Sequence, residues 1–162
     1  MNWRDAYLAQ AWSDYQIFRV LNKGRYPLCH KLHYLQMATE KLAKGFLYSS
    51  KGKPPQKTHY VFVRFLKVSK GRPEWRKKLG FDEHNSKAYA TYIDSLIPVA
   101  DRIEKLAPVG GDFDKVNPEY PWTDDKGDVN CPCRYSFPEF EKTELIKIQK
   151  LVSDLFRIIG LH

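Results

Sequence analysis

The sequence has few cysteines and no long hydrophobic run, and both features restrict what the protein can be. Its 162 residues include three cysteines: Cys29, Cys131 and Cys133. An odd number of cysteines argues against a secreted scaffold held together by disulfides. No apolar run approaches the roughly 18 residues that a membrane-spanning helix needs. The N-terminal segment carries charges and no apolar core, so we expect no signal peptide, no membrane association and a cytoplasmic location.

Patterns that hold metal ions are also scarce. Cys131 and Cys133 are separated by one residue, which is one fewer than in the CxxC pairs of redox and zinc sites. The five histidines are scattered along the chain. The segment TDDKGDVN resembles a calcium loop only superficially, because counting from Asp124 puts Tyr135 where such loops carry a bidentate Glu. We therefore expect a tight acidic turn there, and we expect neither a metal site nor a cofactor.

Acidic residues are almost missing between residues 41 and 78. That segment holds twelve Lys and Arg residues, and its acidic residues reduce to Glu74. The whole chain has a formal net charge of +8. Such a balance favours anionic partners, and nucleic acid is the first to consider. A basic surface that serves only solubility is the alternative, and the sequence leaves both open.

Hydrophobic residues recur every three or four positions over most of the chain, which is the period of an amphipathic helix. A short helical piece around Trp75 follows a turn that contains Gly and Pro. The run THYVFVRF is ambiguous, because its Tyr, Val and Phe residues also suit a strand. The pattern predicts helices over residues 3–22, 27–49, 58–68 and 86–107, and a final helix that opens near residue 136.

Local signals predict where these helices begin and end. Gly24 is the expected left-handed cap of the first helix. Thr58 is the expected N-cap of the third helix. Ser136 and Glu139 have the spacing of a capping box, and Pro138 would lie in the first turn of the final helix.

Residues 108–137 show no helical period and are rich in Gly, Pro and aromatic residues. Long loops of this kind are usually functional or packed down by their own side chains. Tyr120, Trp122 and Tyr135 are suited to stacking on bases, but we expect them to anchor the loop on the helices. The predicted fold is a single all-α domain over residues 1–162, an up-and-down bundle of about five helices with an irregular insertion at 108–137.

The second predicted helix carries a motif that identifies a family resemblance. A Tyr26–Pro27 entry is followed by a Gln-x-Ala-x-Glu-Lys core, and Thr58–His59 opens the next predicted helix. Over residues 5–68 this arrangement resembles the HEPN family. The resemblance implies a small helical bundle, often a homodimer, in bacterial or archaeal proteins that bind nucleotide or RNA. Many members are metal-independent ribonucleases of toxin or defence systems, and others are non-catalytic partners or scaffolds.

Active members of the family depend on an Arg that precedes a His by a short spacer, and two pairs in this chain have that spacing. The pairs are Arg25 with His30 and Arg157 with His162. A His can serve as acid or base near neutral pH, and an Arg can stabilise a phosphate. The first pair lies at the entry of the second helix, whereas the family places the motif on a later helix. The alternative for both pairs is a solvated surface pair without a catalytic role.

Polar residues also share one side of the second helix. Glu40 and Lys44 have the favourable i,i+4 order, and we expect the stripe that contains them to be the polar outer face of a bundle helix. Alternatively, the stripe meets another helix or a dimer partner and lines a nucleotide pocket. His59 is a candidate phosphate ligand at a helix start. The candidate ligand-binding residues are His33, Gln36, Glu40, Lys41, Lys44 and His59.

These observations predict a HEPN-type protein that binds nucleotide or RNA, with ribonuclease activity as a narrower hypothesis. The alternative is a non-catalytic dimerising module that serves a cognate protein partner.

Overall fold

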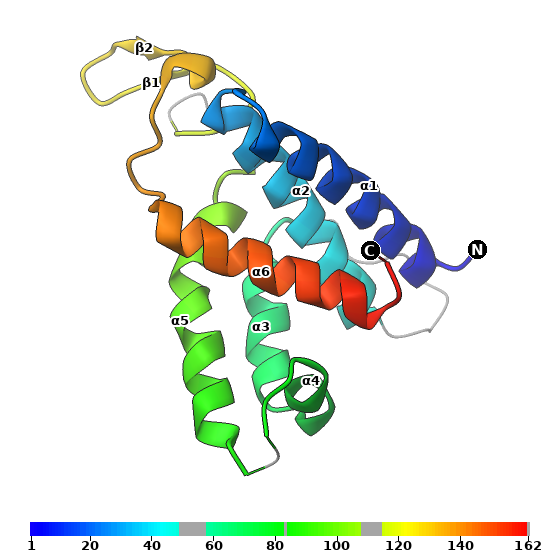
Figure 1. Cartoon of the computed structure of the whole chain (residues 1–162). Helices are drawn as coiled ribbons and strands as arrows, with labels where there is room; N and C mark the ends of the chain where they lie inside the picture. The colour runs from blue at the N-terminus through cyan, green and yellow to red at the C-terminus, as the bar shows by residue number, and fades with distance from the viewer. Residues whose placement is uncertain (49–57, 83, 108–114, 162) are drawn as a thin grey trace.

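The chain forms an all-α bundle, as the periodicity predicted. A computed structural model describes residues 1–48, 58–82, 84–107 and 115–161. Among these residues, none of the helices is long and apolar enough to cross a membrane. The described residues form six α-helices (Figure 1): α1 Trp3–Lys23, α2 Leu28–Leu47, α3 Phe62–Lys70, α4 Pro73–Lys78, α5 Ser86–Glu104 and α6 Lys142–Ile158.

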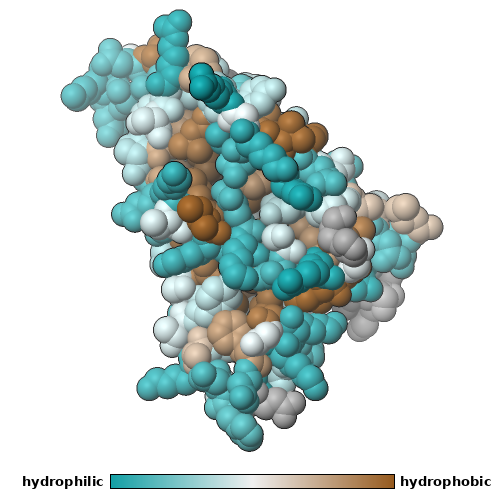
Figure 2. All heavy atoms as spheres, viewed as in Figure 1, coloured by the Kyte–Doolittle hydropathy of each residue, from teal (hydrophilic) through white to brown (hydrophobic). Residues whose placement is uncertain are grey.

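The helices pack in two neighbouring pairs that α6 crosses. Figure 1 shows α1 beside α2 and α3 beside α5, with α6 running diagonally in front of them. Helix α2 lies at the centre of the arrangement and contacts α1, α3 and α5. One continuous hydrophobic core joins side chains from α1, α2, α3, α5 and α6. On the face shown in Figure 2, polar side chains predominate and apolar residues appear in separate patches between them.

Small residues allow α1 and α2 to approach closely. Ala11 on α1 and Ala38 and Ala43 on α2 have no exposed surface. A Cβ added to Gly45 would lie 2.6 Å from Leu8 Cδ2, so the α1–α2 packing leaves no room for a side chain at this position. The close approach buries one long side of α2 against α1.

Aromatic rings join α6 to α1. The Phe156 ring lies 5.1 Å, between ring centroids, from both Trp12 and Tyr15. The Tyr15 hydroxyl also donates a hydrogen bond to the backbone carbonyl of Gln149, at 3.2 Å. These contacts hold the final helix against α1, although the sequence separates the two helices by more than a hundred residues.

The predicted caps of the first and third helices are wrong. Gly24 has φ −96° and ψ 176°, which is extended and not left-handed. Helix α3 begins at Phe62, so THYVFVRF becomes helical only in its second half. The Thr58 hydroxyl instead accepts a hydrogen bond from the Tyr60 backbone N–H, at 3.2 Å, within a turn that precedes the helix.

The final helix also starts later than its capping box predicted. Helix α6 begins at Lys142, and Glu141 precedes it without a side-chain cap. Phe137 has a left-handed φ of 50° and is fully buried, and Phe140 is also buried. Because a left-handed residue cannot continue a right-handed helix, the burial of Phe137 in this conformation is incompatible with a helix that starts at Ser136.

The predicted irregular insertion contains a small hairpin in its described part; residues 108–114 lie outside the described residues. Strands β1 Trp122–Thr123 and β2 Val129–Asn130 pair antiparallel, with Trp122 opposite Asn130. Asp124 Oδ1 accepts hydrogen bonds from the backbone N–H groups of Asp128 and Lys126, both at 3.0 Å. These N–H groups, Asp128 first, hold the pKa of Asp124 below its ordinary value. The expected tight acidic turn is confirmed.

The hairpin continues into a 3₁₀ turn, η1 Pro132–Arg134, and is anchored by aromatic packing. The Trp122 side chain is buried, and its ring meets Tyr135 edge-on at a centroid distance of 4.9 Å. Tyr120 is exposed. Anchoring by the loop's own aromatics is therefore confirmed for Trp122 and Tyr135 and does not extend to Tyr120.

Candidate functional site

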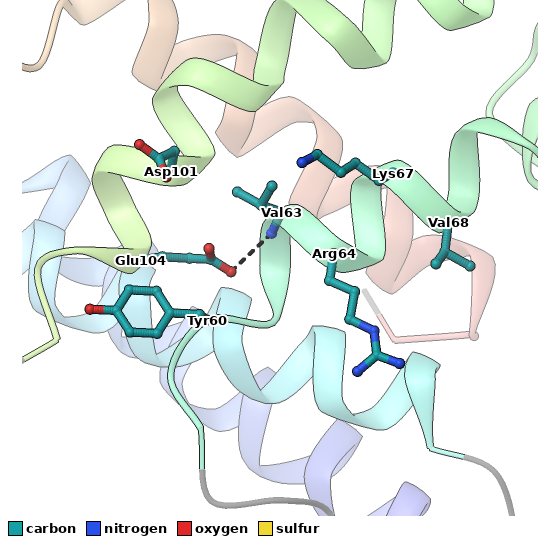
Figure 3. A pocket seen from close by; sticks show the side chains of 7 residues that line it. All are labelled: Tyr60, Val63, Arg64, Lys67, Val68, Asp101 and Glu104. Carbon is teal, nitrogen blue, oxygen red and sulfur yellow. Dashed lines mark hydrogen bonds between the residues drawn. The ribbon is translucent and has the colours of Figure 1, made fainter.

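An open groove runs along the exposed side of α3, where this helix faces the end of α5. Its volume is about 540 Å³. Figure 3 shows that α3 supplies one wall, the C-terminal part of α5 supplies the other, and Tyr60 closes one end. The groove is lined by Tyr60, Val63, Arg64, Lys67, Val68, Asp101 and Glu104.

Two cations in this groove have no acidic partner. Arg64 and Lys67 are exposed and lie about one turn apart on α3, and neither forms an ion pair within the described part of the chain. The two carboxylates of the groove are engaged elsewhere. Asp101 accepts a hydrogen bond from Lys105 Nζ at 2.6 Å, and Glu104 accepts one from the Val63 backbone N–H at 2.9 Å. Arg64 and Lys67 are therefore available to an anion.

Glu104 also defines the geometry of the groove. Its side chain is buried and faces the backbone N–H groups of Val61, Phe62 and Val63 at the start of α3. Burial raises the pKa of Glu104, while hydrogen bonds from these N–H groups act in the opposite direction. Free N–H groups at a helix start need an acceptor. Glu104 supplies it from α5, which fixes the start of α3 against the end of α5.

Two other cations between residues 58 and 78, Lys70 and Arg72, have acidic partners within the fold. Lys70 Nζ lies 2.6 Å from Asp94 Oδ2, and Arg72 is 3.8 Å from Glu74. Lys78 lies over the Trp75 ring. Three lysines of the basic segment, at positions 51, 53 and 57, lie outside the described residues. Within the described part of the basic segment, Arg64 and Lys67 on α3 are therefore the cations that line the groove without an acidic partner.

The polar stripe of α2 is buried, so the expected solvated outer face is wrong. Gln36, Glu40 and Lys44 are 3%, 7% and 9% exposed. Glu40 accepts hydrogen bonds from Lys44 Nζ at 2.5 Å and from Gln36 Nε2 at 3.0 Å, and His59 Nδ1 lies 2.8 Å from it. Lys44 also lies 5.8 Å from the centre of the Tyr7 ring on α1. The stripe therefore meets α1 and the segment before α3.

The electrostatics of Glu40 follow from these partners. Burial alone would raise the pKa of its carboxyl group, but the hydrogen bonds and charges of Lys44 and His59 outweigh it and hold the pKa below its ordinary value. Glu40 is thus a buried carboxylate that is satisfied inside the chain. His59 bridges this cluster to the exterior, because nearly half of its side chain is exposed.

The other two candidate ligand residues on α2 lie in separate contacts. Lys41 Nζ is 2.5 Å from Asp14 Oδ2 on α1. His33 Nδ1 is 2.8 Å from Glu119 Oε1, within ion-pair distance but outside the directions that a hydrogen bond requires. The structure therefore brings together Gln36, Glu40, Lys44 and His59, and it separates Lys41 and His33 from them.

The two Arg–His pairs have different surroundings. Arg25 and His30 are both exposed, and their side chains form no hydrogen bond or ion pair with the described residues. Arg157 is engaged by Asp154, with Nη2 2.9 Å from Oδ1. His162 lies outside the described residues. Arg25 and His30 thus remain accessible to a ligand at the α1–α2 turn, far along the chain from the groove.

No three His, Cys, Asp or Glu side chains in the described residues converge in a way that could hold a metal ion. No protein-family model, curated protein or solved structure matches the chain.

Sequence reasoning did not single out the groove residues. The basic character of segment 41–78 indicated the region of Arg64 and Lys67. Their spacing of three positions on a predicted helix could have identified them as neighbouring phosphate ligands. Glu104 had no such signal. Its partner Val63 is 41 positions away, and only the packing of α5 against α3 brings them together.

Proposed function

We propose that the protein binds RNA or a nucleotide through the groove between α3 and α5. The observation that carries this proposal is that two exposed, unpaired cations, Arg64 and Lys67, line the same groove as the exposed ring of Tyr60. Arg and Lys contact phosphate oxygens, and an exposed aromatic ring stacks on a base of any sequence. The arrangement suits a single-stranded ligand, because a paired base would not be free to stack on Tyr60.

The charge of the chain and the family resemblance support the same class of ligand. A net charge of +8 attracts polyanions before any specific contact forms. The motif around Gln36 and Glu40 resembles the HEPN family, in which nucleotide or RNA binding is common. We therefore assign the protein to nucleotide or RNA binding of the HEPN type.

The test measures binding of a labelled single-stranded RNA at several salt concentrations. The Arg64→Gln/Lys67→Gln variant should bind more weakly. The slope of log affinity against log salt should also fall by about 1.4, since each lost phosphate contact on a single strand removes about 0.7. The matched control is Lys142→Gln/Lys147→Gln, which removes the same charge from exposed positions on α6. An equal loss of affinity in both variants would mean that binding depends only on the net charge of the protein. That result would contradict a groove site.

Ribonuclease activity is a separate hypothesis, and we assign it to Arg25 and His30. Both side chains are exposed, so RNA could reach each of them. In such a site His would take the proton of the ribose 2′-hydroxyl and Arg would stabilise the charge that develops on the phosphate. Binding without cleavage would favour the alternative, a non-catalytic module.

A further inference from the structure

The 3₁₀ turn after the hairpin brings two cysteines together. The Sγ atoms of Cys131 and Cys133 lie 3.3 Å apart, within hydrogen-bond distance for sulfur. Both residues are exposed and neither forms a disulfide. Although the CPC spacing is one residue shorter than that of CxxC pairs, the turn places the two sulfurs side by side.

The backbone around this pair is well supported. Pro132, between the two cysteines, is buried. The Arg134 N–H donates to the Cys131 carbonyl at 3.0 Å, and the Tyr135 N–H donates to the Pro132 carbonyl at 3.2 Å. The turn also packs against α2. The two thiols therefore stand on a rigid element and remain open to solvent.

The surroundings divide the roles of the two thiols. The hydrogen bond with the Cys133 side chain, the Cys133 backbone N–H and the nearby Arg134 lower the pKa of Cys131. The same hydrogen bond raises the pKa of Cys133. Thiolates are the reactive form of cysteine, so Cys131 is the nucleophile and Cys133 holds the proton. Cys29 is 1% exposed, and burial raises its pKa, which makes it unreactive.

We propose that Cys131 and Cys133 form a thiol–disulfide exchange site whose substrate is an accessible low-molecular-weight disulfide. The Cys131 thiolate attacks one sulfur of this disulfide, forms a mixed disulfide and releases the first thiolate. Cys133 then loses its proton to water and attacks Cys131 Sγ, which releases the second thiolate and closes the Cys131–Cys133 bond. The substrate gains the two electrons that the protein dithiol loses.

The geometry is compatible with this second step. The sulfurs must approach from 3.3 Å to about 2.05 Å, and both side chains are exposed and so can rotate. Exposed or strained disulfides are more easily reduced than buried structural ones. We therefore expect the oxidised pair to be reduced again by excess small thiol, so that the site cycles between two states.

The experiment treats the reduced full-length chain with the chromogenic disulfide dithiobis-nitrobenzoate. The unchanged protein should release about two equivalents of coloured thiolate, retain no aromatic adduct and lose about 2 Da. Cys133→Ser should release about one equivalent and keep the adduct, because the resolving thiol is missing. Cys131→Ser should likewise release about one equivalent and keep the adduct on Cys133, because a single exposed thiol has no partner that can resolve the mixed disulfide.

Cys29→Ala is the matched control and should behave as the unchanged protein does. The proposal is overturned if the unchanged protein keeps one adduct on each exposed cysteine, because the thiols then react independently. It is also overturned if Cys29→Ala abolishes the disulfide, since the bond would then involve the buried residue. Oxidised glutathione, used next as substrate, should give the same intramolecular disulfide in the unchanged protein.

Discussion

The carboxylate of Glu104 on α5 accepts a hydrogen bond from the backbone N–H of Val63 on α3, with 2.9 Å between Oε1 and the nitrogen. This contact replaces the missing side-chain cap of α3, whose preceding residue is Val61. It also joins the two walls of the groove that holds Arg64 and Lys67. The stability of the fold and the shape of the candidate binding site therefore depend on the same contact.

Replacing Glu104 should separate its roles as acceptor and as charge. Glu104→Ala removes the acceptor from the start of α3 and should lower the free energy of unfolding by about 1–2 kcal/mol. Glu104→Gln keeps an oxygen acceptor and removes a carboxylate whose pKa burial raises. It should therefore be about as stable as the unchanged protein at neutral pH. Denaturant unfolding of all three proteins measures this, and a Gln variant as unstable as the Ala variant would contradict capping through an oxygen.

Acid should weaken the fold through Glu40. Its pKa lies below the ordinary value in the folded chain, so the folded state resists protonation more than the unfolded state does. The stabilisation is therefore present above the unfolded pKa of about 4.5 and is lost as the pH falls through the folded pKa. The free energy of unfolding, measured from pH 6 downward, should decrease over that window.

The control for this pH dependence is a variant without the carboxylate. Glu40→Gln should be less stable than the unchanged protein at neutral pH, since the buried Lys44 loses its counter-charge. Removing one partner of a buried ion pair costs about 3–5 kcal/mol. The Gln variant should also lack part of the acid-dependent loss. An identical acid profile in both proteins would assign the loss to other carboxyl groups.

A side chain at Gly45 should push α1 and α2 apart. Gly45→Ala places a Cβ 2.6 Å from Leu8 Cδ2 and 2.7 Å from Leu8 Cγ. Overpacking of this kind costs about 1–3 kcal/mol, which thermal or denaturant unfolding would detect. Gly71→Ala is the matched control, because the nearest atom to its Cβ would be 3.9 Å away and its φ of −85° suits any residue. The packing argument fails if the two variants are equally stable.

If Arg25 and His30 form a ribonuclease site, replacing His30 should abolish most RNA cleavage without weakening RNA binding. Purified protein, incubated with mixed transfer RNA and no added metal, should cleave it. His30→Ala should reduce the rate by about 10²–10⁴-fold, the range that a general acid or base contributes. His84→Ala, another exposed His, should leave the rate unchanged. Size-exclusion chromatography of the same samples tests the expected homodimer.

If the unchanged protein binds transfer RNA but does not cleave it, the Arg25–His30 spacing is coincidental and the non-catalytic module is favoured. That outcome would not contradict the proposed binding site between α3 and α5, because this site is tested by replacing Arg64 and Lys67.

The apolar period of the sequence predicted the helices and their class correctly, because each stripe can be read within one segment. Residues 3–22 and 86–107 match α1 and α5 to within a few positions. The anchoring of Trp122 and the acidic turn at Asp124 were also predicted from nearby residues. The starts of α3 and α6 were predicted several positions too early, whereas the other predicted starts match within one position. Tertiary packing determines these two starts: Glu104 caps α3 from α5, and Phe137 is buried in a left-handed conformation before α6.

The sequence by itself determined the all-α class, the basic character of residues 41–78 and the polar side of α2. Only the tertiary structure decided which of these polar groups face water. Glu40 and Lys44 became buried because Ala38, Ala43 and Gly45 let α1 approach α2 closely, while Arg64 and Lys67 remained exposed in the groove beside α5. A periodic pattern shows which residues share a face of a helix, but the packing of the neighbouring elements determines what covers that face.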